Sequence, residues 1–179
     1  MLIETERLRL RPWTERDIGP FAVANSDPEV RRYYYPALLT LNETAEMIAD
    51  CDRHLVDNGF GFVAVERRHD GALVGGLGLS RTGDDIPGGP HIEIGWILAR
   101  PFWRQGYALE AASACLAYGW TTLKLSEVIG YTSAINAPSR RLMERLGMRS
   151  EPAEDFEDTT VPEGNALRPH VLYRIRRPA

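Results

Sequence analysis

The sequence predicts an α/β fold in which helices pack on a mixed, mostly antiparallel β-sheet. Three observations support this prediction. The 179 residues fit a single domain, residues 1–179. In the first half of the chain, helical segments precede two strands joined by an Asp-Gly turn, which is typical of an antiparallel meander. The second half alternates strand, helix, strand, helix and strand, and a strand–helix–strand unit places its two strands parallel.

The N-terminal part of the chain is predicted to form one strand and two short helices. Leucine and arginine alternate over residues 6–13, and this period of two is typical of a half-buried strand. A short helix is expected over residues 17–24. Asp27 then fits the N-cap of a second helix, with Pro28 at its first position.

The middle of the chain is predicted to form a long helix and a hairpin. Residues 42–55 show helical periodicity, with Asn42 or Thr40 as the N-cap. Asp70-Gly71 is a strong hairpin signal between two apolar segments. The flanking strands are expected over residues 61–67 and 73–81, and a loop rich in glycine and proline follows at residues 82–90.

The second half of the chain is predicted to supply the parallel strands. Alanine and leucine at helical spacing indicate a helix over residues 107–120. Asn136 as N-cap, Pro138 in the first turn and Gly147 as the stop signal indicate a second helix over residues 136–146. Strands are expected over residues 91–98, 127–132 and 171–175, and residues 152–169 are expected to be irregular.

The composition argues against several kinds of partner. The net charge of −4 and the lack of a long basic run argue against a nucleic-acid-binding protein. No segment approaches the ~20 apolar residues of a membrane span, so a cytoplasmic protein without a membrane partner is expected. Cys51 and Cys115 lie far apart in the sequence, and no histidine cluster has metal-ligand spacing. Buried thiols and no metal site are therefore expected.

The turn before the predicted helix 107–120 is the strongest candidate for a binding site. Ligands of α/β sheets bind beyond the carboxyl ends of the strands, and the bare N–H groups of a first helical turn suit a phosphate. Gly106 lets the backbone approach such a group because it has no Cβ, and Arg104 and Arg100 add positive charge. A plain structural turn is the alternative. The upstream glycines at residues 75–78 precede no helix and are expected to form a strand.

Longer runs of the sequence resemble a known family. Residues 93–111, Glu-Ile-Gly-Trp-Ile-Leu-Ala-Arg-Pro-Phe-Trp-Arg-Gln-Gly-Tyr-Ala-Leu-Glu-Ala, are similar to the acetyl-CoA-binding core of the GNAT superfamily of N-acetyltransferases. Asn136-Ala137-Pro138-Ser139 and Leu146-Gly147-Met148 resemble the next motif of that family. The resemblance covers about residues 91–151. It is greatest to the branch that acetylates ribosomal-protein N-termini, to which residues 8–13 are a weaker match.

The resemblance implies how a cofactor is held. It predicts a GNAT-like sheet of about six or seven strands, whose parallel pair splays apart to admit the pantetheine arm of acetyl-CoA. The arm would contact backbone near the end of strand 91–98, and the pyrophosphate would lie on the turn around Gly106. Asn136 would combine its capping role with a hydrogen bond toward the pantetheine. The implied cofactor-binding residues are Ile97, Leu98, Trp103, Arg104, Gln105, Gly106, Tyr107, Ala108, Asn136 and Ser139.

The resemblance also implies direct acetyl transfer to a primary amine through a tetrahedral intermediate. Glu93 is the candidate general base, directly or through water, with a structural hydrogen bond as the alternative role. The Ile97 amide is the expected oxyanion donor. Ser139 is the candidate for protonating the leaving thiolate, with helix capping as its alternative. Many family members carry a tyrosine where this chain has Met143, so tyrosine acid catalysis from that position is ruled out.

The acceptor side is less well defined. Tyr33-Tyr34-Tyr35 and His170 are candidates to line it, and packing is the alternative role of the tyrosines. Acidic residues at 151–158 either attract a cationic acceptor or are simply solvated, and Glu110 is expected to make a structural bond to the turn. The acceptor is expected to be a protein N-terminus or a small-molecule amine, and the protein a monomer or homodimer. The alternative functions are a non-catalytic acyl-CoA sensor on the same fold and a structural domain without a coenzyme A site.

Overall fold

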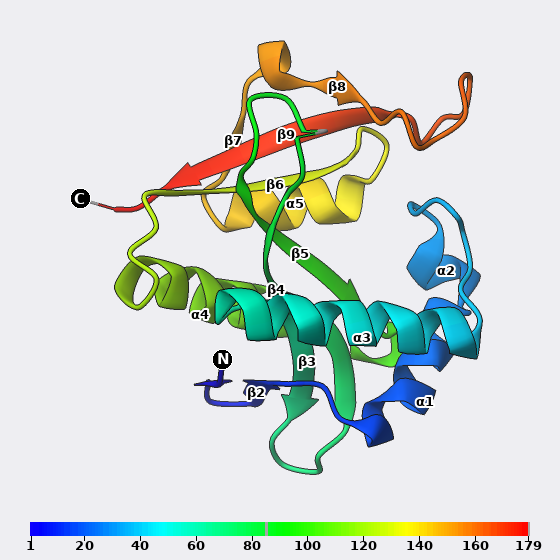
Figure 1. Cartoon of the computed structure of the whole chain (residues 1–179), viewed down its shortest axis with the longest axis vertical. Coiled ribbons are helices and arrows are strands. Elements are labelled where there is room, and N and C mark those ends of the chain that lie inside the picture. The colour runs from blue at the N-terminus through cyan, green and yellow to red at the C-terminus, as the bar shows by residue number, and fades with distance from the viewer. Residues whose placement is uncertain (85, 179) are drawn as a thin grey trace.

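One sheet organises the molecule (Figure 1). The computed structural model describes residues 1–84 and 86–178; residue 85, within the predicted loop 82–90, and residue 179 lie outside the described residues. Strand order in the described part is β1-β2-β3-β4-β5-β6-β9-β7, and β8 also pairs with β9. The strands are β1 (Ile3–Glu4), β2 (Leu8–Arg11), β3 (Phe62–Arg67), β4 (Leu73–Arg81), β5 (Ile92–Leu98), β6 (Glu127–Ser133), β7 (Arg149–Ser150), β8 (Phe156–Glu157) and β9 (Pro169–Arg176).

The predicted mixed sheet is confirmed. Every neighbouring pair of described strands is antiparallel except β5 and β6, which are parallel. The predicted strands correspond to the six longer ones, and β1, β7 and β8 are two-residue additions that no periodicity could reveal. The predicted irregular segment 152–169 contains β8 and the 3-10 helix η2 (Pro152–Glu154).

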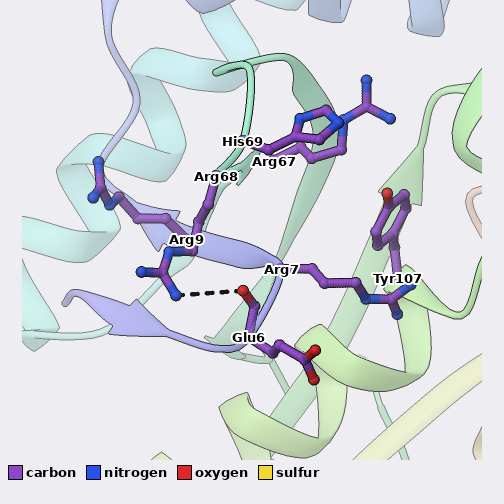
Figure 2. A pocket seen from close by; sticks show the side chains of 7 residues that line it. All are labelled: Glu6, Arg7, Arg9, Arg67, Arg68, His69 and Tyr107. Atoms are coloured by element: carbon purple, nitrogen blue, oxygen red, sulfur yellow. Dashed lines mark hydrogen bonds between the residues drawn. The ribbon is translucent and has the colours of Figure 1, made fainter.

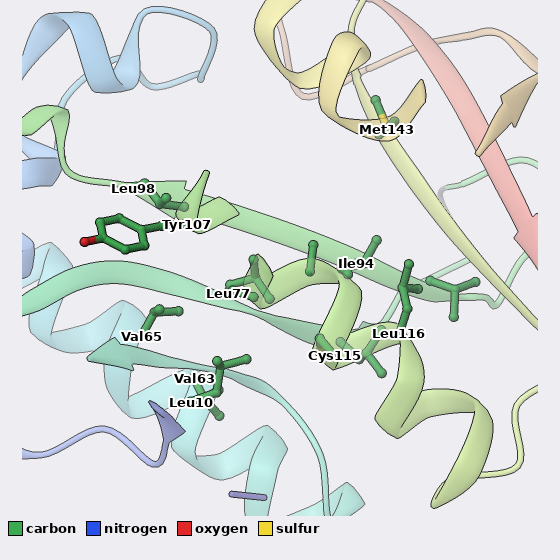
Figure 3. Packing of buried hydrophobic residues seen from close by; sticks show 14 of the residues in the cluster. Leu10, Val63, Val65, Leu77, Ile94, Leu98, Tyr107, Cys115, Leu116 and Met143 are labelled. Carbon is green, nitrogen blue, oxygen red and sulfur yellow. The ribbon is translucent and has the colours of Figure 1, made fainter. Parts of the chain in front are cut away.

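Helices cover both faces of the sheet. Val63 and Val65 of β3 pack with α4, whereas the alternate residues Phe62 and Ala64 pack with α1 and α3. Figure 3 shows the apolar side chains between α4 and the strands, and Figure 1 shows α3 crossing the other side. The helices are α1 (Glu15–Asn25), α2 (Pro28–Arg31), α3 (Leu41–Asn58), α4 (Tyr107–Thr121) and α5 (Ala137–Arg145), with the 3-10 helix η1 (Arg100–Phe102) before α4.

Capping side chains set the helix starts. Thr40, one of two predicted candidates, caps α3: its hydroxyl accepts from the Glu43 amide at 3.2 Å, and the Glu43 carboxylate accepts from the Thr40 amide at 2.7 Å. Helix α1 begins two residues before the predicted start, because Asp17 is the third residue of a capping box with Thr14. Asp17 therefore lies inside the first turn of α1 and not at its start, as the sequence had suggested.

A buried ion network fixes α1 to the sheet. Arg11 of β2 donates to Asp17 at 2.7 and 2.9 Å and to Glu66 of β3 at 2.9 Å. All three residues are at most 9% exposed. Burial raises the pKa of Asp17, but hydrogen bonds from Arg11 and Thr14 outweigh burial and leave that pKa below its ordinary value.

The parallel strands β5 and β6 separate toward their carboxyl ends, as predicted. In the described structure Glu93, near the start of β5, faces Ile129 in their one register pair. Beyond it, residues 94–98 and 130–133 run on without pairing to each other. Because β4 and β9 pair along β5 and β6 respectively, each strand is supported on its outer side only, and a V-shaped gap opens in the sheet.

Candidate functional site

A cavity of about 400 Å³ lies at the V between β5 and β6. Its walls come from β5 and β6, from α3 and α5, from the segment after α2, and from the chain that leads into β9, with one residue each from β3 and β4. Of the ten predicted cofactor-binding residues only Ile97 and Ser139 line it, beside the predicted acceptor residues, and the turn around Gly106 lies outside its lining. The lining residues are Tyr33, Tyr34, Tyr35, Met47, Cys51, Phe62, Ser80, Glu93, Ile94, Gly95, Trp96, Ile97, Tyr131, Thr132, Ser139, Met143, Asp158, Val161, Leu167 and His170.

The turn before α4 presents bare backbone amides. Gly106 is the N-cap of α4 with φ of +82°, and Arg104 also has a positive φ of +59°. Within the described residues, no hydrogen bond engages the amides of residues 104–108, whereas the Trp103 amide bonds the Arg100 carbonyl at 3.2 Å. A Cβ at Gly106 would lie 3.4 Å from an Arg7 nitrogen. The turn thus has free donors and a glycine opening for an anion.

Arg7 is a neighbour of this turn that sequence reasoning missed. It donates to the Gln105 carbonyl at 2.9 Å, and its guanidinium lies 4.6 Å from the centroid of the Tyr107 ring. Glu110 accepts from Arg7 at 2.6 Å and from the Thr5 hydroxyl at 2.6 Å. Glu110 thus makes structural bonds, but its partners are Thr5 and Arg7, and it reaches the turn only through Arg7 and not directly as predicted. Arg7 and Glu110 lie 103 residues apart in sequence, which explains why Arg7 gave no local signal.

Ser139 stands where two donors meet across the V. Its Oγ accepts from Trp96 Nε1 at 3.3 Å and from Asn136 Nδ2 at 3.1 Å. Two donors occupy both lone pairs of a hydroxyl oxygen, so the Ser139 hydrogen remains available for another acceptor. The Ser139 amide bonds Asn136 Oδ1 at 3.3 Å, so Asn136 and not the Ser139 hydroxyl caps α5. The capping alternative for Ser139 is therefore wrong.

Asn136 is a buried N-cap, as predicted, and its amide is largely occupied. Its Nδ2 donates to Thr132 Oγ1 at 2.8 Å as well as to Ser139. Its Oδ1 accepts the Ser139 amide, which leaves one Oδ1 lone pair. The expected contact of Asn136 with a pantetheine amide is thereby restricted to accepting a hydrogen bond.

The backbone of β5 gives a correction to the predicted oxyanion donor. The Ala99 amide bonds the Val74 carbonyl of β4 at 2.9 Å, and alternation along an antiparallel strand directs Ile97 to β4 as well. Trp96 and Leu98 therefore turn their backbone groups toward the V. The Ile97 amide is therefore directed at β4 and not at the V, contrary to the expectation that it serves as the oxyanion donor. The indole of Trp103 donates to the Leu98 carbonyl at 2.7 Å, so this side chain braces the strand end.

Glu93, Met143 and Tyr34 line the cavity nearby. Met143 is 1% exposed and has no proton to donate, which agrees with the exclusion of tyrosine acid catalysis at this position. The Tyr34 hydroxyl donates to the Trp96 carbonyl at 3.0 Å. Burial raises the pKa of Tyr34 to about 12, against the opposing effect of Arg31 and with the help of Glu93. Tyr34 therefore stays protonated and holds the strand on the acceptor side.

The acceptor candidates are brought together only in part. The three tyrosines and His170 line the cavity, but among the acidic residues at 151–158 only Asp158 does so. Glu154 instead pairs with Arg174 at 2.6 Å, and Glu157 pairs with Arg168 at 3.0 Å. Asp158 thus lines the cavity, whereas Glu154 and Glu157 form ion pairs elsewhere.

A second cavity, of about 460 Å³, is lined by arginines (Figure 2). Arg7 pairs with Glu110, Arg9 with Glu4 and Arg67 with Asp70. Arg68 instead donates to the Thr5 carbonyl at 2.6 Å, so three of the four arginines have a carboxylate partner. Its lining residues are Glu6, Arg7, Arg9, Arg67, Arg68, His69 and Tyr107.

Neither cysteine has a pKa that its surroundings lower. Cys115 is buried, and burial raises its pKa to about 12. Cys51 is only partly buried and lines the cavity, where burial raises its pKa to about 11. Among the described residues no group of three or more potential ligands could hold a metal ion. No helix in the described part of the chain combines the length and apolar character needed to cross a bilayer.

Several known proteins are similar to this chain in sequence and in fold. The YnaD protein of Bacillus subtilis, an uncharacterized N-acetyltransferase, is 30% identical over 176 residues, which cover 98% of this chain and 96% of YnaD. The FsC-acetyl coenzyme A-N(2)-transacetylase of Aspergillus fumigatus is 43% identical over 85 residues, 48% of this chain and 36% of that protein. A solved GNAT acetyltransferase from Bacillus anthracis superposes with a TM-score of 0.81 at 28% identity, covering 98% of each chain.

Family membership follows from a match along most of the chain. A Vibrio cholerae structure proposed to be a ribosomal-protein-serine acetyltransferase has the same fold, with a TM-score of 0.75 and 19% identity over 99% of this chain and 98% of that one. The model of the acetyltransferase (GNAT) domain matches residues 7–149. The chain therefore belongs to the GNAT family of acetyltransferases.

Proposed function

We propose that the protein transfers an acetyl group from acetyl-CoA to a primary amine. One observation carries the proposal: β5 leads into a turn of unpartnered amides, and Trp96 of the same strand holds, across the V, a serine whose hydroxyl proton is available. The first feature suits a diphosphate and the second suits a leaving thiolate. The Aspergillus relative, whose name gives an acetyl-coenzyme A reaction at nitrogen, supports the same donor and acceptor elements.

The residues present fit coenzyme A. The amides of residues 104–108 would hold the pyrophosphate, because Gly106 leaves the space that a Cβ would fill. The backbone of Trp96 and Leu98, together with the free Oδ1 lone pair of Asn136, would hold the pantetheine. Acetyl-CoA supplies an acetyl thioester: a C–N bond forms, the C–S bond breaks, and sulfur gains a proton while the amine loses one.

The chain's own groups then divide the work. An amide of Trp96 or Leu98 stabilises the oxyanion that develops at the thioester carbonyl. Ser139 directs its hydroxyl hydrogen toward the sulfur, because both of its lone pairs are occupied. Glu93 receives the amine proton directly or through water. Fixed orientation of the two reactants supplies a large share of the acceleration, up to roughly 7–11 kcal/mol.

Release of free coenzyme A from acetyl-CoA, followed with a thiol reagent over a panel of amines, tests this proposal. We expect turnover with at least one primary amine, and a loss of about a hundredfold in kcat for Ser139→Ala or Glu93→Gln with coenzyme A affinity kept. Binding of coenzyme A without turnover on any amine would refute the proposal. That result would establish the alternative, an acyl-CoA sensor, which stays open because Met143 replaces the tyrosine acid of many family members.

A further inference from the structure

Asp158 and His170 face the same space at the acceptor end of the cavity. Antiparallel pairing of Phe156 with His170 brings β8 beside β9, and Asp158 follows β8 directly. Asp158 Oδ2 lies 3.8 Å from His170 Nε2, and the side chains are 27% and 11% exposed. Both residues line the cavity, so a carboxylate and an imidazole nitrogen stand side by side at its wall.

The surrounding hydrogen bonds turn two acceptors toward that space. His170 Nδ1 lies 3.0 Å from the Arg168 carbonyl, which can only accept, so Nδ1 carries a hydrogen; in a ring with a single N–H, Nε2 is then an acceptor. Asp158 Oδ1 accepts from the amide and hydroxyl of Thr160 at 2.9 and 2.6 Å, and its Oδ2 remains beside His170. The 3.8 Å gap is too long for a direct hydrogen bond. An ammonium group, with three N–H donors, can bridge the two acceptors.

The charge of the cavity also favours a cation. Its described lining contains two carboxylates, Glu93 and Asp158, and neither lysine nor arginine. The Tyr131 ring lies 6.2 Å from the ring of His170, and aromatic faces attract ammonium groups. Arg31 lies outside the lining, stacked at 4.5 Å on Tyr34, and donates to backbone carbonyls.

The size of the cavity restricts the occupant. About 400 Å³ is the space of a small-molecule site, and part of it adjoins Ser139, where transfer takes place. We propose that the acceptor is a small diamine: one amine is acetylated near Ser139 while the other, as an ammonium ion, bridges Asp158 and His170. This inference rests on the proposed function and names its substrate class.

The test compares kcat/KM for 1,4-diaminobutane and n-butylamine, which differ in the second amine. We expect the wild-type protein to prefer the diamine at least about tenfold, because a hydrogen bond between charged groups is at stake. Asp158→Asn should lower kcat/KM for the diamine about tenfold more than for n-butylamine, mainly through KM. Asp155→Asn is the matched control, because Asp155 is exposed on the same segment and does not line the cavity; it should keep the preference.

The remaining outcomes contradict either the diamine inference or the proposed function, and the experiment distinguishes the two. Equal kcat/KM for the two amines in the wild-type protein, or equal loss for both in Asp158→Asn, would overturn the inference and leave the proposed function standing. Acetylation of peptide N-termini with inert diamines would do the same. Failure of every amine to release coenzyme A would overturn the proposed function itself. If Asp158→Asn does not fold, as judged by circular dichroism, the wild-type comparison decides the inference.

Discussion

Replacing Gly106 by alanine separates the binding role of the turn from its structural role. Gly106 has φ of +82°, and forcing an L-residue into this left-handed conformation costs roughly 1–2 kcal/mol. In a domain of this size that cost corresponds to a fall in Tm of about 2–8 °C. The new Cβ would also lie 3.4 Å from a nitrogen of Arg7, which itself bonds the turn at Gln105. Loss of one hydrogen bond to a charged phosphate would weaken coenzyme A binding about ten- to hundredfold.

Gly147→Ala provides the matched control. Gly147 follows α5 with φ of +83°, and a Cβ there would meet nothing within 4 Å. Its backbone cost is therefore the same, but it has no place in the proposed site. Thermal denaturation measures Tm for both variants, and calorimetric titration with coenzyme A measures Kd. We expect similar falls in Tm and a raised Kd for Gly106→Ala alone; an unchanged Kd in Gly106→Ala would refute the pyrophosphate assignment.

Three further predictions concern groups away from the turn. Trp96→Phe removes one of the two donors to Ser139, and we expect kcat to fall several-fold with KM for acetyl-CoA unchanged in steady-state kinetics; an unchanged kcat would contradict the positioning role. The pKa of Asp17 is lower in the folded protein than its value of ~3.9 in the unfolded chain, so ionised Asp17 stabilises the fold above that pH. This stabilisation is lost as the pH falls through the folded-state pKa. Urea titrations should therefore show that the free energy of unfolding of Asp17→Asn depends less on pH in this range than that of the wild type. Cys115, buried with a pKa raised to about 12, should react with a thiol reagent at pH 8 only after unfolding, and labelling of the native protein at this residue would contradict its burial.

Local sequence was sufficient for most of the fold because its signals act over a few residues. The Asp70-Gly71 hairpin and the Asn136 cap were predicted from their own segments and lie where they were expected, and Thr40 is one of the two caps that the sequence allowed for α3. Strands such as β8 escaped prediction because pairing with β9, and not periodicity, creates them. Two residues cannot show a period of two, so only the tertiary structure reveals such a strand.

In the candidate site, too, local motifs could be predicted from the sequence and long-range contacts could not. Ser139 and Gly106 were found because they lie in continuous motifs, whereas Arg7 reaches the turn from the opposite end of the chain. The direction of the Ile97 amide depends on the register between β4 and β5, which the sequence of β5 alone does not contain. Contacts set by sheet register and by long-range side chains were therefore the ones that needed the structure.

The two ends of the cavity have different origins in the chain, and this has a functional consequence. The proposed cofactor end is built from residues 93–139, one strand–helix–strand–helix segment in which Trp96 of β5 bonds Ser139 of α5. The acceptor end is built from residues 33–35 and 158–170, two connecting segments that meet only in space. Changes at Asp158 can therefore alter which amine binds without moving the turn at Gly106. The proposed diamine specificity thus resides in these connecting segments, and the proposed transfer chemistry resides in the sheet.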